Sequence, residues 1–317
     1  MKAYHVYRFS GSAPIQPRAL ELITHMYACV IHHAANPGLP LILVTDARSR
    51  AFYDQWRITA LYDDVITEIF DDYPAQRISP QYWASPKLWA MSKMRTPFAI
   101  LDTDLIFHRP LSDYEVCDVL YLHRESTAIY PNVFDIEGPE GFVWDPEMAR
   151  SFINSQPLNC ALIGMFNEEF KNDYVQRYFD FVLDSSGVLQ LAGENSHRMY
   201  SPAAAQITLE QWFLAALADH WTRVQRRPIR TRAACEVIST SVDFFGYDMD
   251  RGPMTSSDPR LDSTFFHLWG AKTTGRDTES YQRACQTLTA GRFIVENSAY
   301  RDALYEPFTR LLGMLAA

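Results

Sequence analysis

Two aspartates stand one residue apart after an apolar run, Phe98-Ala99-Ile100-Leu101, and the chain continues apolar beyond them. Asp102 and Asp104 are therefore expected beside a buried strand, where bare carboxylates are costly unless they are paired, hydrogen-bonded or bound to a metal. Open α/β sheets bind ligands at the carboxyl ends of their strands. We interpret the two aspartates as Mg²⁺ or Mn²⁺ ligands that leave room for a diphosphate. The alternative is a helix cap and a solvated turn acid.

A histidine in a late segment, Phe265-Phe266-His267-Leu268-Trp269-Gly270-Ala271-Lys272, could join this site. His267 would add an imidazole to the metal, and Lys272 would add an ammonium group to a phosphate. The alternative is a strand-end histidine packed on Trp269 with an exposed lysine. The nearby aspartate pair favours the metal interpretation.

These residues must be positioned by a sheet, and the hydrophobic pattern predicts one. Short apolar runs alternate with stretches of helical periodicity, which is typical of a parallel sheet with covering helices. The expected strands cover residues 4–9, 41–44, 65–69, 98–101, 119–122 and 158–166, and the expected helices cover 19–33, 49–61, 87–94, 170–183 and 208–221. A β-like region is expected at 236–245. Two more helices are expected at 279–290 and 298–315, the second kinked or split by Pro307.

Polar residues follow the first two expected strands. Ser10 and Gly11 follow the first, Thr45 and Asp46 follow the second, and all four are candidates for holding a nucleoside. Plain turn chemistry is the alternative at each position.

The chain shows no internal repeat and no low-complexity linker. We therefore expect one continuous domain over residues 1–275, with a C-terminal helical extension over 276–317 packed on the core.

Composition limits the classes of protein that fit. The formal net charge of −9 argues against a general binder of nucleic acid or anionic membranes. The five cysteines are scattered without C-x-x-C spacing, which favours reduced, buried thiols over disulfides or a zinc site.

No signal region and no apolar run long enough to cross a membrane is present, so a cytoplasmic location is expected. The other histidines have no ligand-like spacing with the residues above and are interpreted as structural: His5, His25, His32, His33, His108, His123, His197 and His220.

Four segments together carry a family resemblance: Leu101-Asp102-Thr103-Asp104, Leu158-Asn159-Cys160-Ala161, Glu210-Gln211, and His267 to Lys272. In this order they resemble nucleotide-sugar glycosyltransferases of the GT-A fold, especially retaining enzymes of the glycogenin and lipopolysaccharide galactosyltransferase type. The resemblance implies a Rossmann-like α/β fold with a mixed, mostly parallel central sheet. Cys160-Ala161 stands where the family has Ser-Gly, and Glu210 stands where it has Asp.

The resemblance also implies roles. Asp102, Asp104 and His267 would hold Mn²⁺ or Mg²⁺ against the diphosphate of a donor, most simply a UDP-sugar. Thr103, Lys87 and Lys272 would contact the donor. Gln211 would lie beside the anomeric carbon, and Asn159 and Glu210 would orient sugar hydroxyls. Ordinary strand-end and helix-start polarity is the alternative for these last three residues.

The function expected from these features is transfer of a sugar from a nucleotide-diphosphate donor to a glycan, lipid or small-molecule acceptor. One alternative is a non-catalytic nucleotide-sugar binder that kept the fold. A phosphatase of the haloacid dehalogenase type also uses D-x-D, but there the motif usually lies on the first strand and continues into Gly-Thr, unlike the Leu105-Ile106-Phe107 found here.

Overall fold

A computed structural model gives the fold of the chain. The residues that it describes are 1–9, 15, 18–79, 82–125, 136–137, 146–184, 190–191, 208–235, 238–239, 242–243, 247–248, 252–253, 265–267, 282, 285–286, 288–289 and 292–316. Ser10, Gly11 and Lys272 lie outside these residues, as do most of the expected helix at 279–290 and the side chain of His267.

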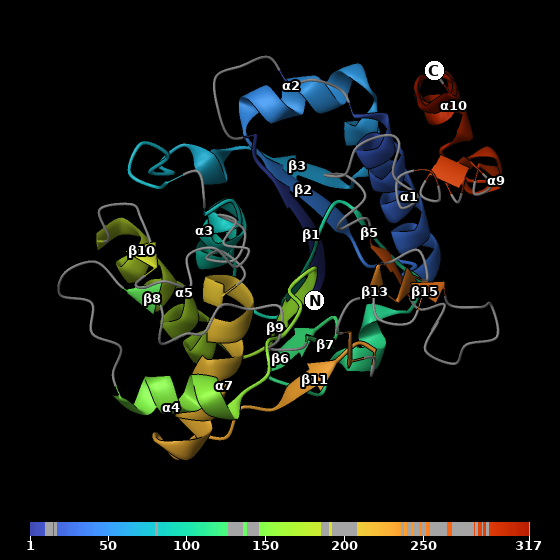
Figure 1. Ribbon diagram of the computed structural model, residues 1–317. Coiled ribbons are helices and arrows are strands. Elements are labelled where there is room, and N and C mark those ends of the chain that lie inside the picture. The colour runs from blue at the N-terminus through green and yellow to red at the C-terminus, as the bar shows by residue number, and fades with distance from the viewer. Residues whose placement is uncertain are drawn as a thin grey trace. The chain divides into compact units, whose positions relative to one another are not determined.

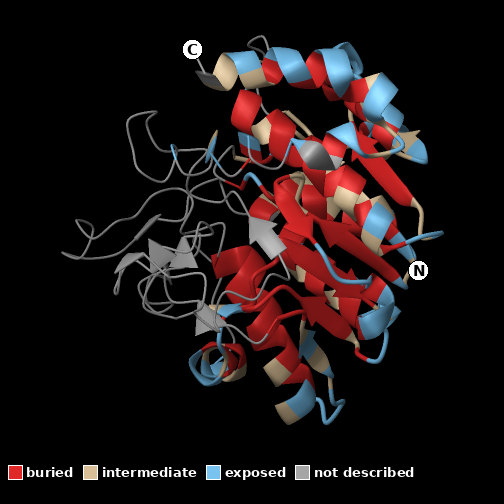
Figure 2. Ribbon diagram, turned by 90° about the vertical axis from the view of Figure 1, so that its right-hand side faces the viewer, coloured by how far each residue is buried: buried red, intermediate tan, exposed pale blue. Residues whose placement is uncertain are grey.

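The main sheet has seven strands in the order β11-β6-β9-β4-β1-β2-β3. The pairs β1–β2, β2–β3 and β11–β6 are parallel, and β6–β9 is antiparallel. The expected mixed, mostly parallel α/β sheet is therefore confirmed. Most strand residues are buried, as Figure 2 shows.

The contacts divide the chain into two compact units. Unit 1 comprises residues 1–68, 100–115 and 241–317, and unit 2 comprises residues 69–99 and 116–240.

Unit 1 is built on the parallel strands β1 (Lys2–Tyr7), β2 (Leu41–Thr45) and β3 (Asp64–Ile66). All five residues of β2 are buried, which explains its unbroken apolar sequence. Helix α1 (Ala19–Ala35) connects β1 to β2 and packs on β2, and α2 (Ala47–Gln55) follows β2. Tyr7 pairs with Thr45, so the segments after β1 and β2 leave the sheet at the same edge.

The last part of the chain belongs to unit 1. Helices α9 (Phe293–Glu296) and α10 (Arg301–Ala316) contact α1 and lie to one side of it in Figure 1. The Tyr27 hydroxyl donates to the Leu288 carbonyl at 2.5 Å, and Leu304 and Leu311 of α10 are fully buried. Three short strands form a separate antiparallel sheet: β13 (Val242–Asp243), β14 (Tyr247–Asp248) and β15 (Gly252–Pro253).

Unit 2 contains β6 (Val119–Tyr121), β9 (Leu162–Met165) and β11 (Thr231–Ala233). Its helices pack in pairs (Figure 1): α3 (Ser85–Lys93) on α5 (Glu168–Asp184), and α4 (Pro146–Asn154) on α7 (Phe213–Arg223). Two minor pairs join β7 (Arg124–Glu125) to β12 (Ile238–Ser239) and β8 (Ile136–Glu137) to β10 (Gln190–Leu191).

The expected elements differ from the observed ones mainly at their ends. The helix expected at 49–61 is α2 followed by a separate 3₁₀ turn, Ile58–Leu61, because Arg57 between them has a left-handed φ of 54°. The strand expected at 158–166 begins later, at Leu162. Pro307 does not split α10, which runs through it. No helix in the described part of the chain combines the length and the apolar character needed to cross a membrane.

Candidate functional site

The aspartate pair forms a turn between two buried strands, β4 (Phe98–Leu101) and β5 (Leu105–Phe107). Strand β4 ends immediately before Asp102, and β5 begins immediately after Asp104. The Leu105 amide donates to the Asp102 carbonyl at 3.0 Å and closes the turn. Asp102 and Thr103 are half-buried, whereas Asp104 is only 5% exposed. The apolar strands fix the backbone on both sides, so the turn is held at the carboxyl end of β4.

The late histidine returns to this turn. Strand β16 (Phe265–His267) pairs antiparallel with β5, and His267 lies opposite Leu105, the residue after Asp104. Residues 163 positions apart in the sequence, Asp104 and His267, are therefore brought to neighbouring positions of one strand pair. Two carboxylates and an imidazole are a donor set that suits Mn²⁺ or Mg²⁺, so these residues fit the implied metal.

The negative charge of Asp104 reaches two buried histidines of unit 1, His5 and His25. Burial lowers the pKa of each imidazole, to about 3 for His25 and well below its usual value for His5, and Asp104 opposes this lowering at both. The carboxylate therefore lies within electrostatic range of a buried aromatic cluster that the sequence had not connected with it.

Of the nucleoside candidates, Thr45 and Asp46 lie at the carboxyl end of β2. Asp46 accepts a hydrogen bond from the Ser49 amide at 2.8 Å and caps α2, and its other oxygen lies 3.6 Å from Arg8 Nε. This is the turn chemistry that was the alternative at this position. Thr45 is fully buried, and its hydroxyl has no hydrogen-bond partner among the described residues.

Four other predicted residues meet inside unit 2. Lys87 on α3 places Nζ 2.8 Å from Glu210 Oε1 and donates to the Cys160 carbonyl at 3.0 Å. Asn159, next to Cys160, is 4% exposed, and Glu210 and Gln211 are 1% and 7% exposed. Resemblance alone had grouped these residues, and the fold brings Lys87, Glu210 and the Asn159 segment into contact.

A residue that the sequence analysis missed fixes the Asn159 side chain. Asn159 Nδ2 donates to Glu125 Oε1 at 2.5 Å, while Asn159 Oδ1 accepts from the Ala161 amide at 3.0 Å. The Glu125 amide donates to the Pro157 carbonyl at 2.9 Å. Both the nitrogen and the oxygen of the Asn159 carboxamide therefore have a partner, and these partners define which way the carboxamide is turned. The only sequence signal for Glu125 was its place just after the apolar run 119–122, which many surface acids share.

Glu210 and Gln211 lie on a π-helical turn, Thr208–Trp212, that opens α7. All five residues of the turn are buried. The Tyr174 hydroxyl donates to the Glu210 carbonyl at 2.8 Å, and the Leu158 amide donates to the Gln211 carbonyl at 3.2 Å. The backbone carbonyls of both residues in this turn therefore have hydrogen-bond partners. Isolated π turns are rare and occur often at functional sites. Here the turn places two consecutive polar side chains in the interior.

Comparisons with known proteins give fold-level likenesses only. No family model matches the chain, and no curated protein sequence matches it significantly. Similar solved structures include the galactosyltransferase LgtC with donor and acceptor sugar analogues, at 11% identity, covering 100% of this chain and 97% of that one, with a TM-score of 0.42. The glycosyltransferase GlyE of Streptococcus pneumoniae is 11% identical, with coverages of 66% and 43% and a TM-score of 0.33, so this chain spans less than half of its length.

Mouse xyloside xylosyltransferase 1 is 12% identical, with coverages of 66% and 80% and a TM-score of 0.33. All three fall in the class that the sequence resemblance names. At these identities the likeness is one of fold.

Proposed function

We propose that the chain is a metal-dependent glycosyltransferase that moves a sugar from a nucleotide-diphosphate donor, a UDP-sugar first, to a glycan, lipid or small-molecule acceptor. One observation carries the proposal: Asp102 and Asp104 form a fixed turn at the end of buried β4, and β16 brings His267 beside it. Asp102, Asp104 and His267 would hold Mn²⁺ or Mg²⁺, which supplies counter-charge for a departing diphosphate.

The polar cluster of unit 2 supplies the groups suited to a sugar. Asn159 keeps a fixed carboxamide, and Glu210 and Gln211 present a carboxylate and a carboxamide from one rigid turn. Lys87 holds Glu210 by an ion pair. In the proposed reaction the bond between the anomeric carbon and the diphosphate oxygen breaks, a bond from that carbon to an acceptor oxygen forms, and the acceptor hydroxyl proton passes to the departing diphosphate. Prepositioned polar groups lower the barrier because they need no reorganisation as charge develops.

Calorimetric titration of UDP and GDP, with and without Mn²⁺, tests the proposal. We expect binding to the native chain that requires Mn²⁺ and is lost in Asp104→Asn, which keeps the size of the side chain. Asp113→Asn is the matched control because Asp113 is an exposed acid of the same unit. Absence of nucleotide binding under all conditions, with a folded protein, would refute the transferase proposal.

The second candidate is a nucleotide-sugar binder without turnover. The observation that favours it is the Lys87–Glu210 ion pair, because a carboxylate already engaged by a lysine has less capacity to act on a sugar. Donor hydrolysis and transfer assays with UDP-sugars separate the two: metal-dependent binding without release of UDP from any donor would favour the binder.

A further inference from the structure

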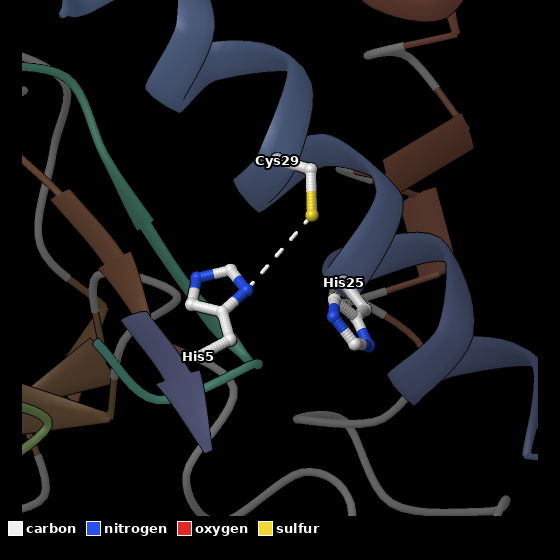
Figure 3. Close-up of side chains that lie close together, drawn as sticks. All are labelled: His5, His25 and Cys29. Atoms are coloured by element: carbon white, nitrogen blue, oxygen red, sulfur yellow. Dashed lines mark hydrogen bonds between the residues drawn. The ribbon is translucent and has the colours of Figure 1, made fainter. Parts of the chain in front are cut away.

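Three donor side chains of unit 1 converge in its core. His5 comes from β1, and His25 and Cys29 come from successive turns of α1, as Figure 3 shows. One ligand atom from each residue lies within 4.8 Å of the other two, and all three residues are buried. Within the described residues this is the one group of three or more such side chains placed to share a metal ion.

Tyr62 adds a fourth donor atom to the cluster. Its hydroxyl lies 2.7 Å from His5 Nδ1 and within hydrogen-bond distance of His25 Nε2, and it also bonds with Cys29. Two imidazole nitrogens and a sulfur are thus gathered around the phenol oxygen of Tyr62. With no metal, a single hydroxyl proton must serve these neighbours, and the tautomers of the two imidazoles have to be matched to it.

We propose that His5, His25 and Cys29, with Tyr62 as the fourth donor, form a site for a borderline-soft divalent cation such as Zn²⁺. Thiolate and imidazole donors select this class of ion, in contrast to the oxygen donors of the Asp102–Asp104 turn. The site is independent of the proposed transferase activity, because it uses none of the same residues.

The distance between the Cys29 sulfur and the His5 nitrogen is close to the one that a tetrahedral ion requires. Zn–S and Zn–N bonds of about 2.3 Å and about 2.0–2.1 Å place the two donor atoms about 3.6 Å apart. Cys29 Sγ and His5 Nδ1 lie 3.9 Å apart. Side-chain rotations of a few tenths of an ångström bring these two donors to bonding distance. The Tyr62 oxygen must move farther, because a nitrogen and an oxygen bound to one tetrahedral ion lie about 3.3 Å apart, whereas this oxygen lies 2.7 Å from His5 Nδ1.

The electrostatics of the cluster suit a cation. Burial lowers the pKa of both imidazoles and keeps them neutral, the form that binds metals. Burial also raises the pKa of the Cys29 thiol to about 12, so a metal would displace its proton on binding. The thiolate would offset one of the two charges of the ion.

Co²⁺ titration of the full-length, chelator-treated protein tests the site, because a cobalt–thiolate bond gives a near-ultraviolet charge-transfer band. We expect this band at one ion per chain, with displacement by Zn²⁺. Cys29→Ser should abolish it. Cys117→Ser, at a buried cysteine of unit 2, and Asp102→Asn, in the oxygen site, should retain it.

A second variant covers the case in which Cys29→Ser does not fold. His25→Gln keeps the thiol and removes one nitrogen ligand, and we expect Co²⁺ affinity to fall at least 10-fold. A folded native chain without the band, a band that survives Cys29→Ser, or unchanged affinity in His25→Gln would overturn the proposal. The cluster would then be a hydrogen-bonded polar core around Tyr62 only. None of these outcomes depends on nucleotide binding, so failure here and failure of the transferase proposal are distinguishable.

Discussion

Lys87 and Glu210 form an ion pair that water hardly reaches. Their side chains are 9% and 1% exposed, and Nζ and Oε1 are 2.8 Å apart. Two charges removed from water lose solvation, and only good geometry and further hydrogen bonds compensate for this loss. Lys87 also donates a hydrogen bond to the Cys160 carbonyl. The pair therefore fixes the π turn that carries Glu210 and Gln211 relative to α3 and the Asn159 segment. One buried ion pair therefore joins three segments that carry residues of the candidate sugar site.

Removing either charge should destabilise the chain more than removing both. We expect Lys87→Met or Glu210→Gln alone to cost about 3–5 kcal/mol, because each leaves the other charge buried without this partner. The double variant should cost less than the sum of the two. Urea unfolding followed by circular dichroism measures this. Asp72→Asn is the matched control: Asp72 lies at the same 2.8 Å from Lys93, but in an exposed pair, and should change the midpoint little. Additive losses in the double variant would contradict the prediction.

At the scale of elements, strands β6 and β9 of unit 2 pack closely at one glycine, Gly164. Gly164 of β9 pairs with Leu120 of β6. A Cβ added at Gly164 would lie 2.9 Å from Leu120 Cβ and 3.1 Å from Phe166 Cε2, both closer than ordinary contacts. The strand pair can approach this closely only because position 164 has no side chain.

Two glycine-to-alanine variants should therefore have opposite effects. Gly164→Ala is expected to destabilise the chain by about 1–3 kcal/mol, since β6 and β9 must separate to admit the methyl group. Gly313→Ala, in α10, meets nothing within 4 Å and should stabilise by about 0.5–1 kcal/mol through helix propensity. Thermal unfolding of the two variants beside the native chain gives the comparison. A Gly164→Ala variant as stable as the native chain would show that the strands yield easily.

At the scale of the whole molecule, buried histidines couple stability to pH. Burial lowers the pKa of His32 from 6.5 to about 4 and that of His25 to about 3. The unfolded chain then binds more protons than the folded one between these values and 6.5. The unfolding free energy therefore rises with pH across this interval. The stability that the neutral histidines contribute is lost progressively as the pH falls below 6.5.

We expect the chain to be markedly less stable at about pH 5 than at about pH 7.5, with about 2 kcal/mol lost for each such histidine. Urea unfolding at the two pH values, in the presence of a chelator, measures the loss. His32→Gln should show a pH dependence smaller by about this amount, whatever its stability at neutral pH. An identical pH dependence in the variant would mean that His32 is protonated in the folded state or is not the source.

The sequence by itself determined the class of fold and the place of its most polar turn. Alternation of apolar runs and helical periodicity depends on neighbours along the chain, so β2, β4, α1, α3 and α5 were predicted to within a few residues. The same local logic placed Asp102 and Asp104 at the end of a buried strand, because two acids directly after an apolar run cannot both lie in the core. Their metal-binding role, like the roles of the other site residues, remains a prediction.

Tertiary structure alone decided which distant side chains meet. Glu125 holds Asn159, and Lys87 holds Glu210, across 34 and 123 positions of sequence. Likewise, His5 and His25 were interpreted as structural because they have no ligand-like spacing with the Asp102 and His267 segments, yet α1 brings His25 and Cys29 beside His5 of β1. No local pattern records such contacts, because a polar side chain can be satisfied equally well by water or by any partner that the packing supplies. Only the folded chain removes the water and selects the partner.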